Sequence, residues 1–176
     1  MKLQTAKNLE TVKFMLDLLK DIEMVFFDFD GVFTDNRVLV SSDGKESVFC
    51  HRSDGIGLSR IKEVGVASMV ISSESDTVVT KRCTKLKIKC IQACENKLQV
   101  MTRIITERNL NPKQIAFVGN DLNDLECMMY VGIPIAVADA YPQIKTSAKL
   151  VTACKGGYGA VREICDWILD VKQKNG

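Results

Sequence analysis

The chain has 176 residues, of which 46% are hydrophobic and 26% charged, and its formal net charge is +2. This profile is typical of one globular domain with its own core, and it excludes a disordered chain. The near-neutral charge gives no reason to expect a nucleic-acid or anionic-membrane partner, and no apolar run approaches the ~18 residues needed to cross a bilayer. The 7 cysteines have neither framework spacing nor a CxxC pair, which favours reduced thiols and a cytoplasmic location over disulfides or a zinc site.

Residues 1–22 predict an amphipathic helix or linker, because Val12, Met15, Leu16 and Leu19 share one helical face. Residues 23–176 are expected to form a single domain in which strand-like and helix-like segments alternate. The expected strands are 24–28, 67–72, 89–92, 115–119, 132–136 and 149–152. The expected helices are 56–64, 76–86, 97–108, 121–130 and 160–171. This alternation predicts an α/β fold, a Rossmann-like parallel sheet flanked by helices.

One segment departs from that alternation. The stretch "NRVLVSSDGKESVFC" contains two short strand patterns joined at Ser-Asp-Gly, which predicts a β-hairpin at about 37–50. The hairpin is inserted directly after the first strand.

The first strand ends in two acids, Asp28 and Asp30, although a strand buried on both faces should not carry uncompensated charge. Ligands of open α/β sheets bind at the carboxyl ends of the strands. The loops at that edge also hold Ser72, Lys97 and the polar segment 120–124. We therefore expect these side chains to converge on one site.

Paired acids repel each other, and a bound divalent cation relieves the repulsion. Oxygen donors suit a hard ion such as Mg²⁺, whose open positions suit a phosphate. The expected metal set is Asp28, Asp30, Asn120, Asp121 and Asp124. A hydroxyl from Ser72 and the charge of Lys97 complete what phosphoryl transfer needs. A carboxylate can then attack phosphorus, and a second acid can protonate the leaving oxygen.

The segments "DFDGVFTD", "VISS", "CENKLQV" and "VGNDLND" resemble, in that order, the four motifs of the haloacid dehalogenase superfamily of phosphatases. The resemblance covers about residues 24–169. It implies that Asp28 is the nucleophile and Asp30 the general acid/base. It also implies that Ser72 and Lys97 bind phosphate and that Mg²⁺ is the cofactor. One position departs from the pattern, because Asn120 stands where the family usually has an acid, which predicts weaker metal binding.

The gaps between the motifs leave no room for a cap domain, so something else must cover the site. This resembles the capless subgroup that contains 3-deoxy-manno-octulosonate 8-phosphate phosphatase and its nine-carbon relatives. In that subgroup the hairpins assemble a homotetramer in which a neighbour closes each site. The segment "KGGYGAVRE", residues 155–163, resembles the glycine-rich C-terminal segment of the subgroup. The resemblance therefore implies that the hairpin and this segment close neighbouring sites.

The resemblance favours a nine-carbon substrate, a sialic acid or 2-keto-3-deoxynononate (KDN) 9-phosphate, with the octulosonate 8-phosphate as the alternative. Glu74 matches the nine-carbon pattern after the second motif, and the same resemblance assigns Arg82 and Lys85 to substrate binding. These two side chains could hold a sugar carboxylate. A solvated basic helix face explains them equally well, and Glu74 could instead favour the dipole at a helix start.

Two other functions stay open. The chain also resembles the phosphatase-like domain at the C-terminus of some CMP-sialic acid synthetases (acylneuraminate cytidylyltransferases). It could therefore be a weakly active or inactive tetramerisation module linked to such a synthetase. A phosphotransferase or mutase is disfavoured, because a phosphorylated intermediate needs enclosure from water.

Overall fold

Six parallel strands form the central sheet of the computed structural model, which describes residues 9–173. Their order is β5-β4-β1-β6-β7-β8. The strands are β1 (Met24–Phe27), β4 (Ala67–Ile71), β5 (Lys89–Ile91), β6 (Ile115–Gly119), β7 (Ile133–Ala136) and β8 (Leu150–Val151). β1 pairs in parallel with β4 on one side and with β6 on the other. The predicted α/β fold is therefore confirmed.

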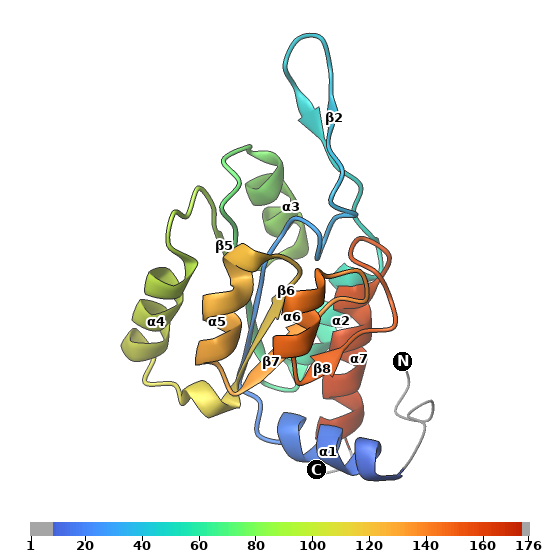
Figure 1. Cartoon of the computed structure of the whole chain (residues 1–176), viewed down its shortest axis with the longest axis vertical. Helices are drawn as coiled ribbons and strands as arrows, with labels where there is room; N and C mark the ends of the chain where they lie inside the picture. Colours follow the sequence, from blue (N-terminus) through green and yellow to red (C-terminus); the bar gives the residue numbers. More distant parts are fainter. Residues whose placement is uncertain (1–8, 174–176) are drawn as a thin grey trace.

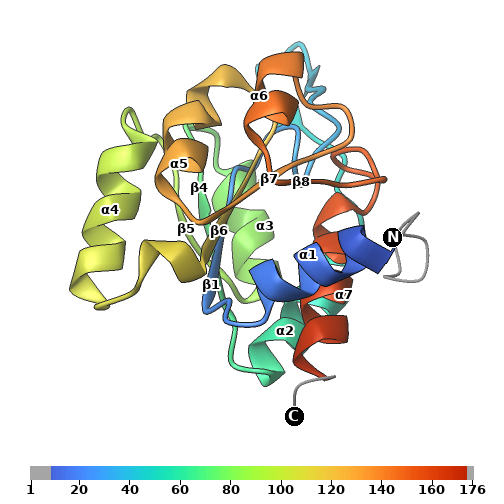
Figure 2. The same ribbon diagram turned by 60° about the horizontal axis from the view of Figure 1, so that its bottom comes forward.

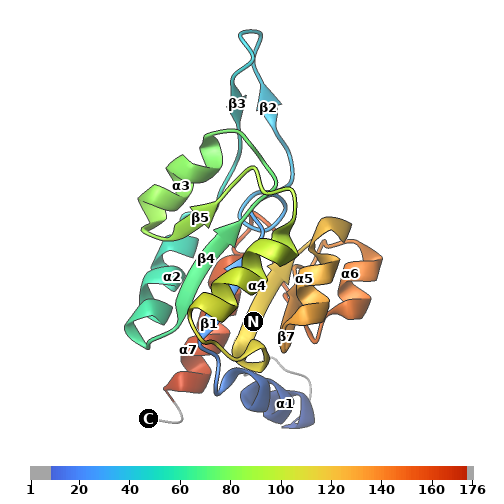
Figure 3. The ribbon, with the colours of Figure 1, turned by 90° about the vertical axis from the view of Figure 1, so that its left-hand side faces the viewer.

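Helices cover both faces of this sheet (Figure 3). One face carries α2 (Asp54–Glu63), α3 (Val78–Leu86) and α7 (Ala160–Lys172), and the other carries α4 (Lys97–Glu107), α5 (Leu125–Tyr130) and α6 (Pro142–Ser147). This division follows from right-handed crossovers, because the chain first runs outward from β1 to β5 and then returns to β6. The helix α1 (Leu9–Leu19) lies beside α7, below the sheet in the view of Figure 1 and toward the viewer in Figure 2.

The apolar run of β1 explains its central place. Its four residues are all buried, as expected of a strand covered by helices on both faces. Phe26, Phe27 and Phe117 are fully buried in the core around it. This packing fixes the end of β1, and therefore the residues that follow Phe27.

The predicted hairpin is also confirmed. β2 (Leu39–Val40) and β3 (Glu46–Ser47) pair antiparallel and project away from the body of the protein (Figure 1). Val38, Leu39 and Phe49 in this arm are 51%, 64% and 70% exposed. Within the described residues, no cap domain interrupts the chain between β1 and α2 or between β4 and α4.

The differences from the predicted elements concern short segments. The helix expected at 121–130 begins as a 3₁₀ turn, η3 (Leu122–Asp124), before α5. A second 3₁₀ turn, η2 (Pro112–Gln114), and α6 were not predicted, because three and six residues are too few to show helical periodicity. Residues 1–8 of the predicted N-terminal helix lie outside the described residues. None of the described helices is long and apolar enough to traverse a bilayer.

Candidate active site

Three neighbouring strands bring the motif residues to one edge of the sheet. Asp28 follows β1, Ser72 follows β4 and Asn120 follows β6, and these are adjacent strands. After β1 the chain continues on one side of it through β4 and β5, and it then returns to the other side at β6. The site therefore lies at the topological switch point of the sheet. The sequence expectation that these loops converge is met by Asp28, Asp30, Asn120 and Asp121, which line one pocket.

Lys97 lies between two carboxylates behind that pocket. Its Nζ is 2.8 Å from Asp28 Oδ1 and 2.8 Å from Asp124 Oδ1. Burial alone would lower the pKa of Lys97, but the two carboxylates outweigh it and raise that pKa. Lys97 is the first residue of α4, and Asn96 caps that helix by accepting a hydrogen bond from the Gln99 amide.

Asp28 has one oxygen held and one free. Oδ1 accepts hydrogen bonds from Lys97 Nζ and from the Phe29 amide. Among the described residues, Oδ2 has no hydrogen-bond partner. Burial, together with the negative charge of Asp124, raises the pKa of Asp28 to about 7, although Lys97 opposes this shift. A cation in the pocket would favour the ionised form.

Asp30 lies at the mouth of the same pocket. Burial, followed by the negative charge of Glu74, raises its pKa above the ordinary value. The Thr34 hydroxyl donates a 3.5 Å hydrogen bond to Asp30 Oδ1. A carboxyl group whose protonated form is favoured can give a proton to a leaving oxygen.

The pocket has a volume of about 280 Å³ and is lined by Asp28, Asp30, Asn36, Asn120, Asp121 and Asn123. Every one of these side chains offers an oxygen. Asn120 is 6% exposed, and its Oδ1 is buried without a hydrogen-bond partner. Such an unpaired oxygen calls for an explanation. A hard cation in the pocket supplies one, so the donor set fits Mg²⁺.

This donor set does not form a closed cage. Within the described part of the chain, no three His, Cys, Asp or Glu side chains gather into a metal-binding group. A cation held here therefore relies on amide oxygens and keeps positions for water or substrate.

Asp124 does not line the pocket, although the sequence places it among the metal ligands. It is completely buried, and its Oδ2 accepts hydrogen bonds from the Asn120 and Asp121 amides. Its Oδ1 accepts from Lys97. Because both of its oxygens accept hydrogen bonds, Asp124 holds the loop that contains Asn120 and Asp121 and also positions Lys97.

Ser72 and Glu74 occupy the loop after β4. Ser72 is 1% exposed, and its Oγ accepts a hydrogen bond from the Glu74 amide, which leaves the hydroxyl proton available as a donor. Glu74 Oε1 accepts from the Ser75 and Asp76 amides. The side chain of Glu74 therefore orders its own turn, while its charge acts on Asp30.

Arg82 and Lys85 lie apart from the acidic pocket. They line a separate groove between α2 and α3. Arg82 Nη2 donates a 2.9 Å hydrogen bond to the backbone carbonyl of His51. No residue lines both cavities, so the structure does not bring these two side chains to the acids of their own chain.

The structure adds Asn36, which the sequence analysis missed, and singles out Asn123 within the segment 120–124 that was expected at the site. Asn36 and Asn123 line the pocket. Asn36 has φ of 61°, a left-handed conformation that asparagine tolerates better than most residues. Thr34 holds this turn, because its Oγ1 accepts from the Gly31 and Asn36 amides. The position of Asn36 directly after the first motif was the sequence feature that could have indicated its place in the site.

The C-terminal glycine-rich segment lies against the same loop. The Gly157 amide donates to the Val32 carbonyl at 3.1 Å. A Cβ on Gly156 would collide with the Gly31 carbonyl oxygen. The segment 155–163, expected from the subgroup to close a neighbour's site, thus packs on the first loop of its own chain.

Comparisons with known proteins agree with this geometry. Residues 61–164 match the family described as haloacid dehalogenase-like hydrolase. The 3-deoxy-D-manno-octulosonate 8-phosphate phosphatase of Escherichia coli K12 is 33% identical over 151 residues, which are 85% of this chain and 80% of that protein.

Two solved structures extend this likeness. A protein assigned to the HAD family of hydrolases from Streptomyces avermitilis has 42% sequence identity and a TM-score of 0.84, covering 86% of this chain and 87% of that one. The 3-deoxy-D-manno-octulosonate 8-phosphate phosphatase of Moraxella catarrhalis, solved with magnesium, phosphate and KDO, has 28% identity and a TM-score of 0.88. That match covers 92% of this chain and 94% of the other.

Proposed function

This chain belongs to the haloacid dehalogenase-like hydrolases, and from that membership we propose that it is a Mg²⁺-dependent phosphatase of sugar-acid phosphates that works through Asp28. The observation that carries the proposal is the position of Lys97, 2.8 Å from both Asp28 and Asp124 beside an oxygen-lined pocket. This position supports the proposal, because Asp28 as nucleophile, the fixed positive charge of Lys97 and a cation in the pocket would then share one small volume. Those are the parts that phosphoryl transfer requires.

In the first step, Oδ2 of Asp28 attacks phosphorus, and the bond from phosphorus to the sugar oxygen breaks. Asp30 gives its proton to that departing oxygen. In the second step, Asp30 accepts a proton from water, whose oxygen attacks phosphorus and releases Asp28. Mg²⁺, when bound, neutralises charge on the phosphoryl oxygens. Ser72 donates its hydroxyl proton to the phosphoryl group, and Lys97 stabilises its negative charge.

The relatives support 3-deoxy-manno-octulosonate 8-phosphate as the substrate, because the similar Escherichia coli and Moraxella catarrhalis proteins carry that activity in their names. The nine-carbon 9-phosphate favoured by the sequence analysis stays a second candidate. The observation in its favour is Glu74, whose charge acts on Asp30 at the mouth of the pocket. From there Glu74 could accept hydrogen bonds from sugar hydroxyls.

Assembly into a tetramer is part of this proposal. Arg82 and Lys85 line a groove that shares no residue with their own acidic pocket, which supports a role for them at the site of a neighbouring copy. The projecting hairpin exposes Leu39 and Phe49, which suit burial between copies. A neighbour would also supply the cover that the absent cap domain does not.

The test is phosphate release with Mg²⁺ from octulosonate 8-phosphate, nonulosonate 9-phosphates and an aryl phosphate. We expect turnover of a sugar-acid phosphate above the aryl phosphate, abolished by Asp28→Asn. A preference for the 9-phosphate would reassign the substrate and keep the mechanism. If no compound is turned over faster than by Asp28→Asn, the chain is instead the assembly module considered above, linked to a CMP-sialic acid synthetase.

A further inference from the structure

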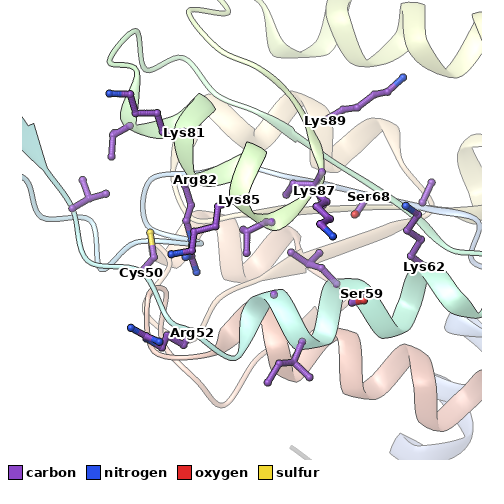
Figure 4. Close-up of a pocket in the computed structure, with 18 of the residues that line it drawn as sticks. Cys50, Arg52, Ser59, Lys62, Ser68, Lys81, Arg82, Lys85, Lys87 and Lys89 are labelled. Atoms are coloured by element: carbon purple, nitrogen blue, oxygen red, sulfur yellow. The ribbon is translucent and has the colours of Figure 1, made fainter.

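A second cavity, larger than the acidic pocket, runs between α2 and α3 along the edge of the sheet (Figure 4). Its volume is about 1460 Å³. We call it the basic groove, because its lining includes eight basic side chains, namely Arg52, Lys62, Lys81, Arg82, Lys85, Lys87, Lys89 and Arg108.

The charge of this groove is not balanced from within. Its only acidic lining residues are Glu46 and Asp76. Among the described residues, none of the eight cations forms an ion pair with a carboxylate. The whole chain carries a net charge of only +2, so this is a local concentration of positive charge. Like charges at this spacing repel each other unless an anion lies among them.

The groove has two ends with different surroundings. Arg82 and Lys85 lie at the hairpin end and belong to the proposed substrate site. The other end is the strand-start cluster, which we define as Lys62, Lys87, Lys89 and Arg108. Lys62 belongs to α2, Lys87 is the C-cap residue of α3, and Lys89 is the first residue of β5.

The strand-start cluster lies at the opposite end of the sheet from the acids. Arg108 Nη1 is 3.9 Å from Sδ of Met24, the first residue of β1. Lys89 pairs with Met69, the middle residue of β4, which precedes Ser72 by three positions. At about 3.3 Å per strand residue, that separation is roughly 10 Å. None of the four cluster residues lines the acidic pocket. The cluster is therefore not a part of the catalytic pocket.

Two serines lie among these lysines. Figure 4 shows Lys62 on α2 and Lys87 at the end of α3, with Ser68 of β4 between them in this view and Ser59 on α2, while Lys89 points away from both lysines. The apolar side chains of Leu58, Val66 and Ile88 line the same part of the groove. The site thus offers positive charge, hydroxyl groups and an apolar wall.

Protection of the sheet edge does not account for the cluster. Lysines on an edge strand discourage pairing with another chain, which is a sufficient reason for Lys89 on β5. Lys62 lies on a helix, and Arg108 follows a helix on the other face of the sheet. Lys62, Lys87 and Arg108 thus line one groove from separate elements, as in a site that surrounds a ligand.

We propose that the strand-start cluster binds the polyphosphate group of a small molecule, as found in nucleoside di- and triphosphates or in inorganic pyrophosphate. A chain of phosphates carries several negative charges and can meet several of these cations at once, whereas a single carboxylate carries only one charge. The hydroxyls of Ser59 and Ser68 donate to the remaining phosphate oxygens. The apolar wall accommodates the organic part of a nucleotide. This site is separate from the proposed phosphatase site and does not depend on it.

Isothermal titration of the full chain in Mg²⁺ buffer, with inorganic pyrophosphate and with ATP as probes, tests the proposal. The Asp28→Asn background prevents turnover of either probe. We expect Lys62→Gln/Lys87→Gln/Lys89→Gln to weaken binding by about tenfold, the combined effect of three exposed charge contacts. The matched control is Lys13→Gln/Lys20→Gln/Lys113→Gln, which removes the same charge from exposed positions outside the groove. That control is expected to stay within about twofold of the parent.

A second variant, Arg82→Gln/Lys85→Gln, separates the two ends of the groove. It should leave the affinity for both probes within about twofold of the parent. Tighter binding of ATP than of pyrophosphate assigns the apolar wall to the nucleoside, and equal binding assigns the site to the phosphate chain alone. The proposal is overturned if neither probe binds, if the control loses as much as the cluster variant, or if the loss follows Arg82 and Lys85. Binding of polyglutamate but of neither probe also overturns it, because the groove would then be a docking surface for an acidic polypeptide.

Discussion

Lys97 Nζ lies 2.8 Å from Asp28 Oδ1 at the end of β1, in a site where both side chains are almost completely buried. The same nitrogen is equally close to Asp124 Oδ1. One cation therefore compensates two buried carboxylates, which explains how a strand covered on both faces can end in an acid. A phosphoryl group on Asp28 would lie beside the same positive charge.

Removing Lys97 should lower the free energy of unfolding, because two buried carboxylates lose their shared positive charge. Breaking a buried ion pair from one side typically costs about 3–5 kcal/mol, because the partner charge is left uncompensated. We expect Lys97→Met to lower the free energy of unfolding by about 3 kcal/mol in urea without added metal. Lys97→Met/Asp124→Asn should recover part of that loss, since it leaves one buried carboxylate instead of two. If the double variant is less stable than Lys97→Met, Lys97 does not compensate Asp124.

The contribution of Asp30 to the rate should be larger for a poor leaving group than for a good one. A general acid contributes about 10²–10⁴-fold when it protonates an alkoxide-like oxygen. Asp30→Asn should slow hydrolysis of the phospho-enzyme for both substrates, because Asp30 is also the base of the second step. The acid role therefore appears in the first step, measured as the pre-steady-state burst of alcohol or phenol release. That burst should slow far more for a sugar-acid phosphate than for an aryl phosphate, whose leaving oxygen needs no proton. Asp28→Asn is the control, because loss of the nucleophile should abolish the burst with both substrates. Equal slowing of the burst with both substrates in Asp30→Asn would show that Asp30 is not the acid.

Asn120→Asp should change stability in opposite directions with and without metal. The new carboxylate would replace the unpaired Oδ1 beside Asp28, adding negative charge to a buried acidic pocket. In EDTA we expect a lower unfolding temperature than that of the parent. In millimolar Mg²⁺ we expect a higher one, because binding to the folded state adds stability. The Mg²⁺ concentration for half-maximal activity should fall about tenfold.

Asn123→Asp is the matched comparison for this change. It makes the same substitution in the same pocket at an exposed position, where water screens the charge. Its unfolding temperature should respond less to EDTA and to Mg²⁺. If the two variants respond equally, the buried oxygen of Asn120 is not a metal ligand.

Asp54 gives a pH dependence of stability outside the catalytic pocket. It is 1% exposed in the first turn of α2, and its Oδ1 is buried without a hydrogen-bond partner. Burial raises the pKa of Asp54 from 3.8 to about 7, against the opposing effects of the Arg162 backbone and the charges of Arg82 and Arg162. Between these two pH values the folded chain retains a proton that the unfolded chain releases.

The contribution of Asp54 to the unfolding free energy therefore falls as pH rises from about 4 to about 7. Asp54→Asn cannot ionise, so it should be more stable than the parent at pH 8, with the difference shrinking toward pH 4.5. Urea unfolding across this range measures the difference, and Asp21→Asn at an exposed position is the control. A stability difference that does not change with pH would show that Asp54 is ionised throughout.

Features of the fold and site that depend on neighbouring residues in the sequence could be predicted, whereas features that depend on tertiary packing could not. The buried run before Asp28 and the alternation after it were enough to predict the sheet and the edge at which the acids lie. Contacts between distant segments were not predictable in the same way. The sequence places Asp124 in the metal set, but its oxygens are taken by Lys97 and by its own loop, which only tertiary packing decides. Arg82 was assigned to substrate binding by resemblance alone, and its place on α3 beside a groove separate from the acids is likewise decided by tertiary packing.

The hairpin provides the last prediction, which concerns assembly. Phe49 is 70% exposed in the projecting arm, and Met129 is equally exposed on α5, so the two side chains offer a matched pair. If hairpins of neighbouring copies pack together, Phe49→Ser removes apolar contact area from each interface and should shift the tetramer toward dimers or monomers. Light scattering at micromolar concentration measures this shift, and Met129→Ser should leave the molar mass unchanged.

Turnover of a sugar-acid phosphate should fall together with the molar mass, because Arg82 and Lys85 would reach a substrate only from a neighbour. Turnover of a small aryl phosphate, which lacks the sugar carboxylate, should fall much less. A parent chain that is already a monodisperse monomer would contradict the shared site. It would require the open acidic pocket to bind its substrate with the residues of a single chain.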